Sequence, residues 1–205
     1  MRRANEAIRH ILETAKWFFR HDDPDQEVRI RLLRESLERV DRKLRDEAEV
    51  DPALAGMGTT LTALSIMEDD AFLVHVGDSR VYLLRDGSLD QLTTDHTLVQ
   101  EMIQKGILTP ESARHHHLRH VITNVVGGPP GVKGEIANIR LLNGDRLLLC
   151  TDGLTEVVRD AEITEILLRH PNPHDACTAL VEVALSHGGP DNVTVIVADC
   201  AIGNG

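Results

Sequence analysis

Two-residue turns between apolar runs constrain the fold of this chain more than any other feature. The turn Asp86-Gly87 lies between the runs Val81–Arg85 and Ser88–Leu92. The turn Asn143-Gly144 lies between the runs Ile136–Leu142 and Arg146–Cys150. Asp-Gly and Asn-Gly are the dipeptides that two-residue β-hairpin turns favour, because both tolerate a left-handed backbone. The pattern therefore predicts two hairpins, and consecutive hairpins build antiparallel rather than parallel sheets.

The other apolar runs from residue 51 onward predict further strands and several helices. Strands are expected at Thr59–Ile66, Ala71–Val76 and Val193–Ala198, and helices near residues 97–105, from Thr109, at Ala161–Arg169 and at His174–Leu185. Several of these strands are apolar on both faces, so each sheet needs a cover on both sides. The sequence therefore predicts an α+β fold, a four-layer α-β-β-α sandwich of two antiparallel sheets flanked by helices.

The first 50 residues have a helical rather than a strand pattern. Apolar side chains share one face over residues 4–19 and again from Val28 to Leu44, and the cluster Asp22-Asp23-Pro24-Asp25 separates the two runs. Aspartate and proline end one helix and cap the next. We therefore expect a helical hairpin at residues 1–50, within a single domain that spans residues 1–205.

The composition limits the partners and the compartment of the chain. Its net charge is −11 and 41% of its residues are apolar. A sizeable core is therefore expected, and neither nucleic acid nor an anionic membrane is an expected partner. No apolar run is long enough to span a membrane, and no secretory signal pattern is visible. The three cysteines are far apart, which predicts reduced thiols in a cytoplasmic protein.

Three aspartates lie in short glycine-containing turns at the ends of strand-type runs. They are Asp78 in His75–Arg80, Asp152 in Leu149–Leu154 and Asp191 in Gly188–Val193. Aspartate beside glycine is common in ordinary turns, and this interpretation stays open for each residue alone. Three carboxylates delivered from strand ends can also converge on a cation. Oxygen ligands without cysteine or histidine at zinc-ligand spacing favour Mg²⁺ or Mn²⁺, ions that suit hydrolysis of a phosphate ester.

A histidine-rich run follows the helix expected from Thr109. Three adjacent histidines, His115 to His117, cannot all face one ion from regular structure, since successive residues point in different directions. A solvated helix end is the simpler interpretation, and Arg114 and Arg119 make it a basic patch that could meet a phosphorylated partner. Cys150 precedes Asp152 by two residues, but its place in an apolar strand predicts a core residue rather than a nucleophile.

Five short motifs follow one another in a fixed order within residues 51–199. They are Gly56–Thr62, Val76–Gly87, Leu92–Thr97, Cys150–Leu154 and Gly189–Thr194. In sequence, order and spacing these motifs resemble those of the metal-dependent protein serine/threonine phosphatases of the PP2C (PPM) family, and most of all its bacterial branch.

This resemblance implies the same α-β-β-α sandwich, with a binuclear Mn²⁺ or Mg²⁺ centre and no other cofactor. Asp152 and Asp191 match core metal ligands and catalytic residues of the family, and Asp78 matches an additional third-metal site. Residues 92–121 resemble the flap beside the active site. The implied activity is hydrolysis of phosphoserine and phosphothreonine in proteins by a metal-activated water. The implied partners are phosphorylated proteins, namely a Hanks-type Ser/Thr kinase and its substrates in signalling.

The amino terminus departs from the family pattern. Family members begin with two strands that carry an Arg, an Asn-Glu-Asp segment and an Asp-Gly-Met/His-Gly-Gly motif, whereas this chain enters at the helix that follows. We therefore expect an N-terminally truncated fold without the metal-bridging Asp. That Asp would hold two cations close together, and without it the remaining aspartates repel one another. Weak metal binding and poor hydrolysis of phosphoesters are therefore expected. The alternative is a pseudophosphatase, a non-catalytic module that binds phosphoproteins or other partners.

Overall fold

The computed structural model describes residues 25–202 of the chain. The first helix expected from the sequence, at residues 4–19, lies outside the described residues. The described chain divides into two compact units. One contains the residues up to Gly77 together with Ile122–Ile139, and the other contains Asp78–Val121 together with the residues from Arg140 onward. The expectation of a single domain stays a prediction.

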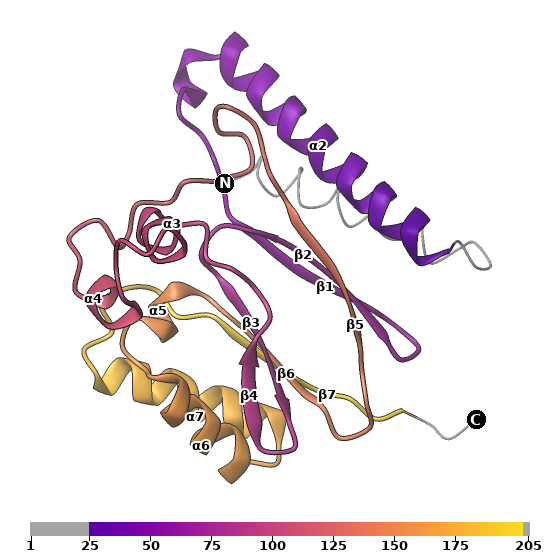
Figure 1. The fold of residues 1–205 in the computed structure, drawn as a ribbon, viewed down its shortest axis with the longest axis vertical. Helices are drawn as coiled ribbons and strands as arrows, with labels where there is room; N and C mark the ends of the chain where they lie inside the picture. Colours follow the sequence, from indigo (N-terminus) through magenta and orange to yellow (C-terminus); the bar gives the residue numbers. More distant parts are fainter. Residues whose placement is uncertain (1–24, 203–205) are drawn as a thin grey trace. The chain divides into compact units, whose positions relative to one another are not determined.

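The first unit is a three-stranded sheet covered by one long helix. Its elements are α2 (Gln26–Val50), the short 3-10 helix η1 (Pro52–Leu54), β1 (Leu61–Met67), β2 (Asp70–Val76) and β5 (Glu135–Arg140). The strand order is β1-β2-β5, and β1 pairs with β2 in antiparallel register. Figure 1 shows α2 running alongside these strands. Leu37, Val40 and Leu44, at helical spacing on α2, share a buried cluster with Val74 and Val76 of β2.

A buried carboxylate ties α2 to the segment that precedes β5. Asp41 on α2 is only 2% exposed. Its Oδ1 accepts a hydrogen bond from the backbone N–H of Gly127 at 2.8 Å, and its Oδ2 accepts one from Nε of Arg45 at 2.9 Å. Both carboxylate oxygens are therefore satisfied, which makes the burial of this charge tolerable.

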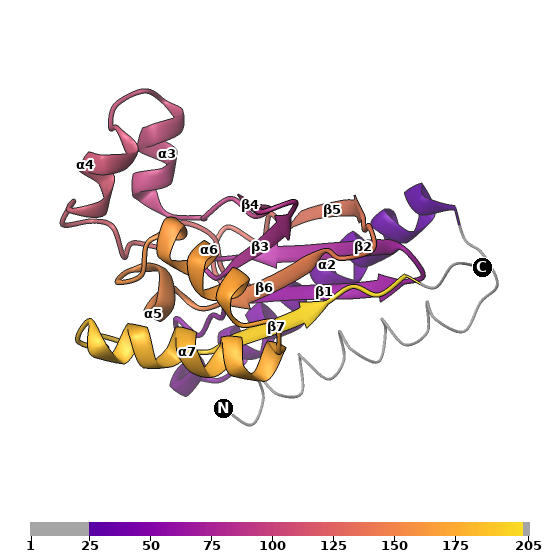
Figure 2. The ribbon, with the colours of Figure 1, turned by 90° about the horizontal axis from the view of Figure 1, so that it is seen from below.

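The second unit is a four-stranded antiparallel sheet with helices on its buried face. Its strands are β3 (Arg80–Arg85), β4 (Ser88–Gln91), β6 (Arg146–Cys150) and β7 (Val195–Asp199), in the order β4-β3-β6-β7. Its helices are α5 (Asp152–Thr155), α6 (Asp160–Arg169) and α7 (Pro173–Ser186). Figure 2 shows α6 and α7 beside β6 and β7. Side chains from these strands and helices form one buried cluster, and the largest of them are Tyr82, Leu148, Leu154, Ile163, Leu167 and Leu180.

The segment predicted as a flap contains two short helices of the second unit. They are α3 (Leu98–Gln104) and α4 (Pro110–Arg114), and Figure 2 shows both standing out beyond the strands. The side chain of Thr97 caps α3 by accepting from the N–H of Gln100, and Thr109 and Ser112 cap α4 reciprocally. The backbone N–H of Leu98 also donates to the carbonyl oxygen of Val121 at 2.9 Å, so the two ends of the segment are joined.

One of the two hairpins expected from the sequence is confirmed and the other is wrong. Asp86 and Gly87, both at positive φ, join β3 to β4, which pair directly. Asn143-Gly144 also forms a turn, but the strands on either side belong to different sheets, because β5 pairs with β2 and β6 pairs with β3 and β7. Here the turn is tied to the carboxyl-terminal segment, since the N–H of Gly144 donates to the carbonyl oxygen of Cys200. A turn dipeptide reverses the chain without fixing which strand pairs with which.

Among the described helices, none combines the length and the apolar character needed to cross a bilayer.

We predict that the core of the second unit is sensitive to truncation at Leu148. This side chain is fully buried in β6, whereas Leu168 on α6 is 56% exposed. Leu148→Ala should lower the free energy of unfolding by about 2–5 kcal/mol, because it removes buried apolar atoms and leaves a cavity. The matched control Leu168→Ala should change it by less than about 0.5 kcal/mol. Urea unfolding measures both values, and equal losses would contradict the assigned core.

Candidate metal and phosphate site

The pairing of β3 with β6 determines where two of the three candidate aspartates lie. Arg80 is opposite Cys150 at the end of this antiparallel ladder. Asp78 precedes β3 by two residues and Asp152 follows β6 by two residues, so both lie just beyond this end of the ladder. The two carboxylates therefore come from neighbouring turns at the same end of two paired strands.

The third candidate turn is held against the Asp152 turn by hydrogen bonds just after Asp191. The N–H of Thr151 donates to the carbonyl oxygen of Thr194 at 3.1 Å, and the N–H of Thr194 donates to Oγ1 of Thr151 at 3.0 Å. The backbone also approaches closely here. A Cβ on Gly153 would lie 2.4 Å from the carbonyl oxygen of the residue after Asp191, so only glycine fits.

The electrostatics of Asp78 reflect this crowding of carboxylates. Burial, followed by the negative charge of Asp152, raises the pKa of Asp78 from 3.8 to about 6. Asp95 adds to the increase, while a backbone hydrogen bond and the charge of Arg80 oppose it. The ionised form of Asp78 is therefore disfavoured in the protein alone, and a cation beside it would relieve that cost.

Asp78 and Asp152 line one cavity of about 290 Å³, which we call the aspartate cavity. Arg80 and Asp95 lie in its wall and form a two-pronged ion pair, with Nε to Oδ1 at 2.8 Å and Nη2 to Oδ2 at 2.7 Å. Nη1 of Arg80 donates to the hydroxyl of Tyr82 at 2.9 Å. The sequence patterns assigned no role to Arg80 or Asp95, although both lie in the motifs named above. The position of Arg80, immediately after Asp78-Ser79, was the sequence signal that could have placed it at the site.

Asp191 is placed differently from the other two candidates. Its side chain is exposed, and its Oδ1 accepts a hydrogen bond from the N–H of Asn192 at 2.7 Å. Within the described part of the chain, Asp78, Asp152 and Asp191 do not form a group whose oxygens all lie within 4.8 Å of one another. The structure thus brings Asp78 and Asp152 into one cavity and holds the Asp191 turn against the Asp152 turn.

Basic side chains from the flap segment also line the aspartate cavity. Arg114, Arg119 and His120 all line it, and each is exposed. Nδ1 of His120 lies 2.6 Å from Oε1 of Glu156, a residue that follows α5 and also lines the cavity. The lining therefore combines carboxylates, which suit a bound metal, with arginines, which suit a phosphate.

The structure also places the histidine run and Cys150. The three adjacent histidines follow the end of α4, with His115 and His117 exposed and His116 half-buried. They form a solvated helix end, as predicted. Burial raises the pKa of the Cys150 thiol from 9.0 to about 12, which fits a core residue rather than a nucleophile.

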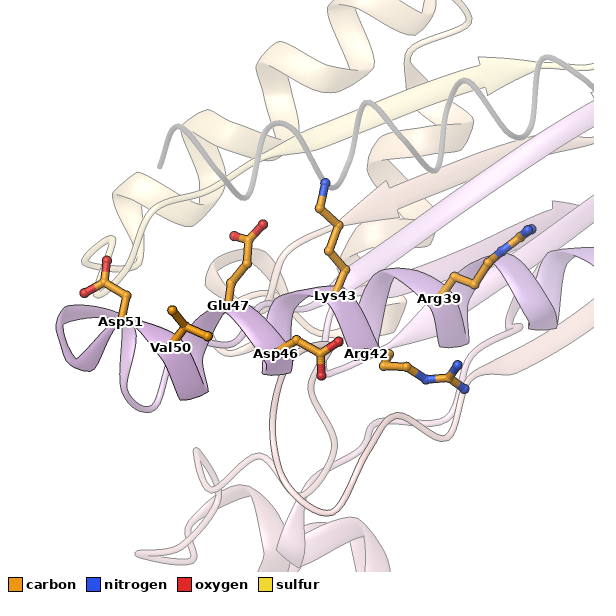
Figure 3. Close-up of a pocket in the computed structure, with 7 residues that line it drawn as sticks. All are labelled: Arg39, Arg42, Lys43, Asp46, Glu47, Val50 and Asp51. Carbon is orange, nitrogen blue, oxygen red and sulfur yellow. The ribbon is translucent and has the colours of Figure 1, made fainter.

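A larger cavity, of about 620 Å³, lies along α2 in the first unit and contains none of the candidate residues. Its described lining is Arg39, Arg42, Lys43, Asp46, Glu47, Val50 and Asp51. Figure 3 shows these side chains spread along the helix rather than converging on a point. Acids and bases alternate there, as on a solvated helix face. Size alone therefore does not identify the functional site.

Comparison with known proteins agrees with this geometry. The sequence pattern of the protein phosphatase 2C family matches residues 3–188. The chain belongs to the protein phosphatase 2C family. The serine/threonine protein phosphatase PstP of Mycobacterium tuberculosis is 46% identical over 153 residues, which cover 75% of this chain and 29% of PstP. The protein phosphatase PhpP of Streptococcus pneumoniae is 41% identical over 145 residues, covering 71% of this chain and 59% of PhpP.

A solved structure extends the match to the fold. The catalytic domain of PstP in complex with two manganese ions superposes with a TM-score of 0.80 at 36% identity, covering 96% of this chain and 81% of that one. The protein phosphatase 2C fold class, with two antiparallel sheets flanked by helices, is therefore confirmed, and so is the family resemblance. The aligned segment spans less than two thirds of the length of PstP and of PhpP.

We predict that Asp78 destabilises the metal-free protein at neutral pH. Because its folded pKa, about 6, lies above the ordinary value of 3.8, its ionisation opposes folding. This penalty is absent below about pH 4 and fully present above about pH 6. The shift corresponds to about 3 kcal/mol, and partial solvent exposure reduces it. Asp78→Asn should therefore raise the free energy of unfolding by about 1–2 kcal/mol at pH 7 and by little at pH 4.

The matched control for this measurement is Asp90→Asn, an exposed position on β4 of the same sheet. Urea unfolding of both variants in a chelating buffer at the two pH values gives the comparison. A gain for Asp78→Asn that does not grow from pH 4 to pH 7 would contradict the assigned electrostatics.

Proposed function

We propose that this chain is the catalytic part of a metal-dependent protein phosphatase that hydrolyses phosphoserine and phosphothreonine in proteins. The observation that carries the proposal is that Asp78 and Asp152 line one cavity together with Arg114 and Arg119. Membership of the protein phosphatase 2C family supports the same activity. The alternative of a non-catalytic phosphoprotein-binding module is motivated by the departure of the amino terminus from the family pattern, and no contact in the described residues favours it over the enzyme.

The donor atoms fit a hard divalent cation. Asp152 and Asp191 would hold the core ions, and Asp78 would hold an additional ion beside Asp152. All three offer carboxylate oxygens, the ligands that Mg²⁺ and Mn²⁺ prefer. The raised pKa of Asp78 supports this assignment, because burial and the charge of Asp152 disfavour its ionised form in the absence of a cation. We infer Mn²⁺ or Mg²⁺ as the cofactor, and the two manganese ions in the PstP structure support that choice.

Bound divalent ions supply an acidified water nucleophile and neutralise charge on the phosphate oxygens. The side chains of the chain perform the remaining tasks. Arg114 and Arg119 line the cavity where a phosphate monoester would enter, and their positive charge would attract it and hold it. The Arg80–Asp95 ion pair would hold the Arg80 guanidinium in place in the wall next to Asp78.

The substrates proposed for this site are phosphorylated proteins. A Hanks-type Ser/Thr kinase and its substrates are the partners that we propose, because the relatives PstP and PhpP are named as bacterial protein phosphatases. A cytoplasmic location fits this role, and the three cysteines, which are all free, support it.

The proposed activity predicts phosphate release that requires both the metal and Asp152. Hydrolysis of p-nitrophenyl phosphate and of a phosphothreonine peptide should depend on added Mn²⁺ and stop with a chelator. Asp152→Ala should lower kcat/KM by about a hundredfold or more, because it removes a proposed metal ligand. The exposed control Asp90→Ala should leave it unchanged. The assay is run on the chain and on the chain extended by its upstream genomic sequence, since the aligned relatives are longer.

Two results would contradict the proposal. One is hydrolysis that continues at the same rate in the Asp152→Ala variant. The other is absence of hydrolysis by both versions of the protein while they still bind the phosphothreonine peptide, which is the behaviour of a non-catalytic binding module.

A further inference from the structure

A second cavity of the same unit lies next to the aspartate cavity and has a different lining. It encloses about 440 Å³ and is formed by Arg114, His115, Arg119, Glu156, Val157, Arg159 and Pro190. We call it the arginine cavity. It contains none of the three candidate metal ligands, although Pro190 directly precedes Asp191. Three guanidinium groups around one hollow are unusual for a chain with a net charge of −11, in which acids outnumber bases.

The three arginines of this cavity have no anionic partner. Within the described residues, the side chains of Arg114, Arg119 and Arg159 take part in no hydrogen bond or ion pair, and all three are exposed. Other arginines of the unit behave differently. Arg80 is bound to an aspartate, and Arg85 binds Asp145 at 2.6 Å. The donors of the arginine cavity therefore remain available to a ligand.

The arginine cavity shares part of its wall with the aspartate cavity. Arg114, Arg119 and Glu156 line both of them. The one carboxylate shared by the two cavities, Glu156, is held by His120, so its charge is partly engaged. Arg159 belongs to the arginine cavity alone and lies at the N-cap of α6, where its side chain makes no capping hydrogen bond. A ligand that filled the aspartate cavity could thus extend past the shared arginines to Arg159.

We propose that the arginine cavity binds a second anionic group, a phosphate or a carboxylate, on the same polypeptide segment that presents its phosphoresidue to the aspartate cavity. This inference rests on the proposed phosphatase function. A guanidinium group binds phosphate and carboxylate through two parallel hydrogen bonds, and several arginines around one hollow select an anion strongly. The substrates favoured by this chain are therefore multiply phosphorylated or acidic segments. A segment with one isolated phosphate would fill the aspartate cavity and leave the arginine cavity empty.

The binding experiment uses fluorescent peptides with a hydrolysis-resistant phosphonate analogue of phosphothreonine. One peptide carries this group alone among alanines. Further peptides add phosphoserine at each position within five residues on either side, and a parallel series adds glutamate instead. Fluorescence anisotropy with Mn²⁺ present gives the Kd of each peptide for the full chain. At one or more positions the second anion should tighten binding about tenfold, as expected for one additional charge-assisted contact.

Two arginines of α6 and its cap provide a matched pair of variants. Arg159→Ala removes a cavity arginine, whereas Arg169→Ala removes one at the far end of α6, where it pairs with Glu165. Arg159→Ala should lose most of the gain from the second anion, and Arg169→Ala should keep it. Arg159→Lys, which retains the charge without the fork of donors, should recover part of it. Circular dichroism confirms that each variant is folded.

The outcomes separate the inference from the proposed activity. If no second anion improves binding at any position, or if Arg159→Ala keeps the full gain, the arginine cavity has no such role, whether or not the chain hydrolyses phosphopeptides. If the gain appears and depends on Arg159 while hydrolysis is absent, the cavity is an anion site and the phosphatase proposal fails by itself. A gain with phosphoserine but not glutamate assigns the site to phosphate, and equal gains assign it to acidic groups in general.

Discussion

The antiparallel register of β3, β6 and β7 is the constraint on which the candidate site depends. It places Asp78 and Asp152 in neighbouring turns, because each lies two residues beyond the terminal pair of Arg80 and Cys150. It also brings the segment after Asp191 against Thr151, since Cys150 pairs with Val195 on the other side. A shift of one residue in either ladder would turn the carboxylates to opposite faces. The buried side chains of β3 and β6 prevent such a shift, because it would expose the core.

This register has an electrostatic cost that a cation can remove. Burial, followed by the negative charge of Asp152, raises the pKa of Asp78. Arg80, which is half-buried beside it, is already bound to Asp95, while Arg114 and Arg119 of the flap segment line the same cavity. Carboxylates and arginines in one cavity would suit a metal ion and a phosphate, respectively.

Much of the fold could be predicted from the sequence because its signals are local. The turn at Asp86-Gly87 and the caps at Thr97 and Thr109 each need only a few adjacent residues, and all are present in the structure. The hairpin predicted at Asn143-Gly144 is wrong, because long-range packing and not the turn determines which strands pair. The aspartates could be named from their motifs, but the Arg80–Asp95 pair and the arginine cavity join residues distant in sequence. No local pattern specifies such contacts.

The most direct test of this account is the position of manganese in crystals of the chain. Diffraction data collected at the manganese absorption edge, from crystals soaked in Mn²⁺, locate each ion by its anomalous signal. The account predicts peaks within coordination distance, about 2.0–2.3 Å, of the carboxylate oxygens of Asp152 and Asp191, and a further peak at Asp78. Manganese bound elsewhere, with these three aspartates unoccupied, would contradict it.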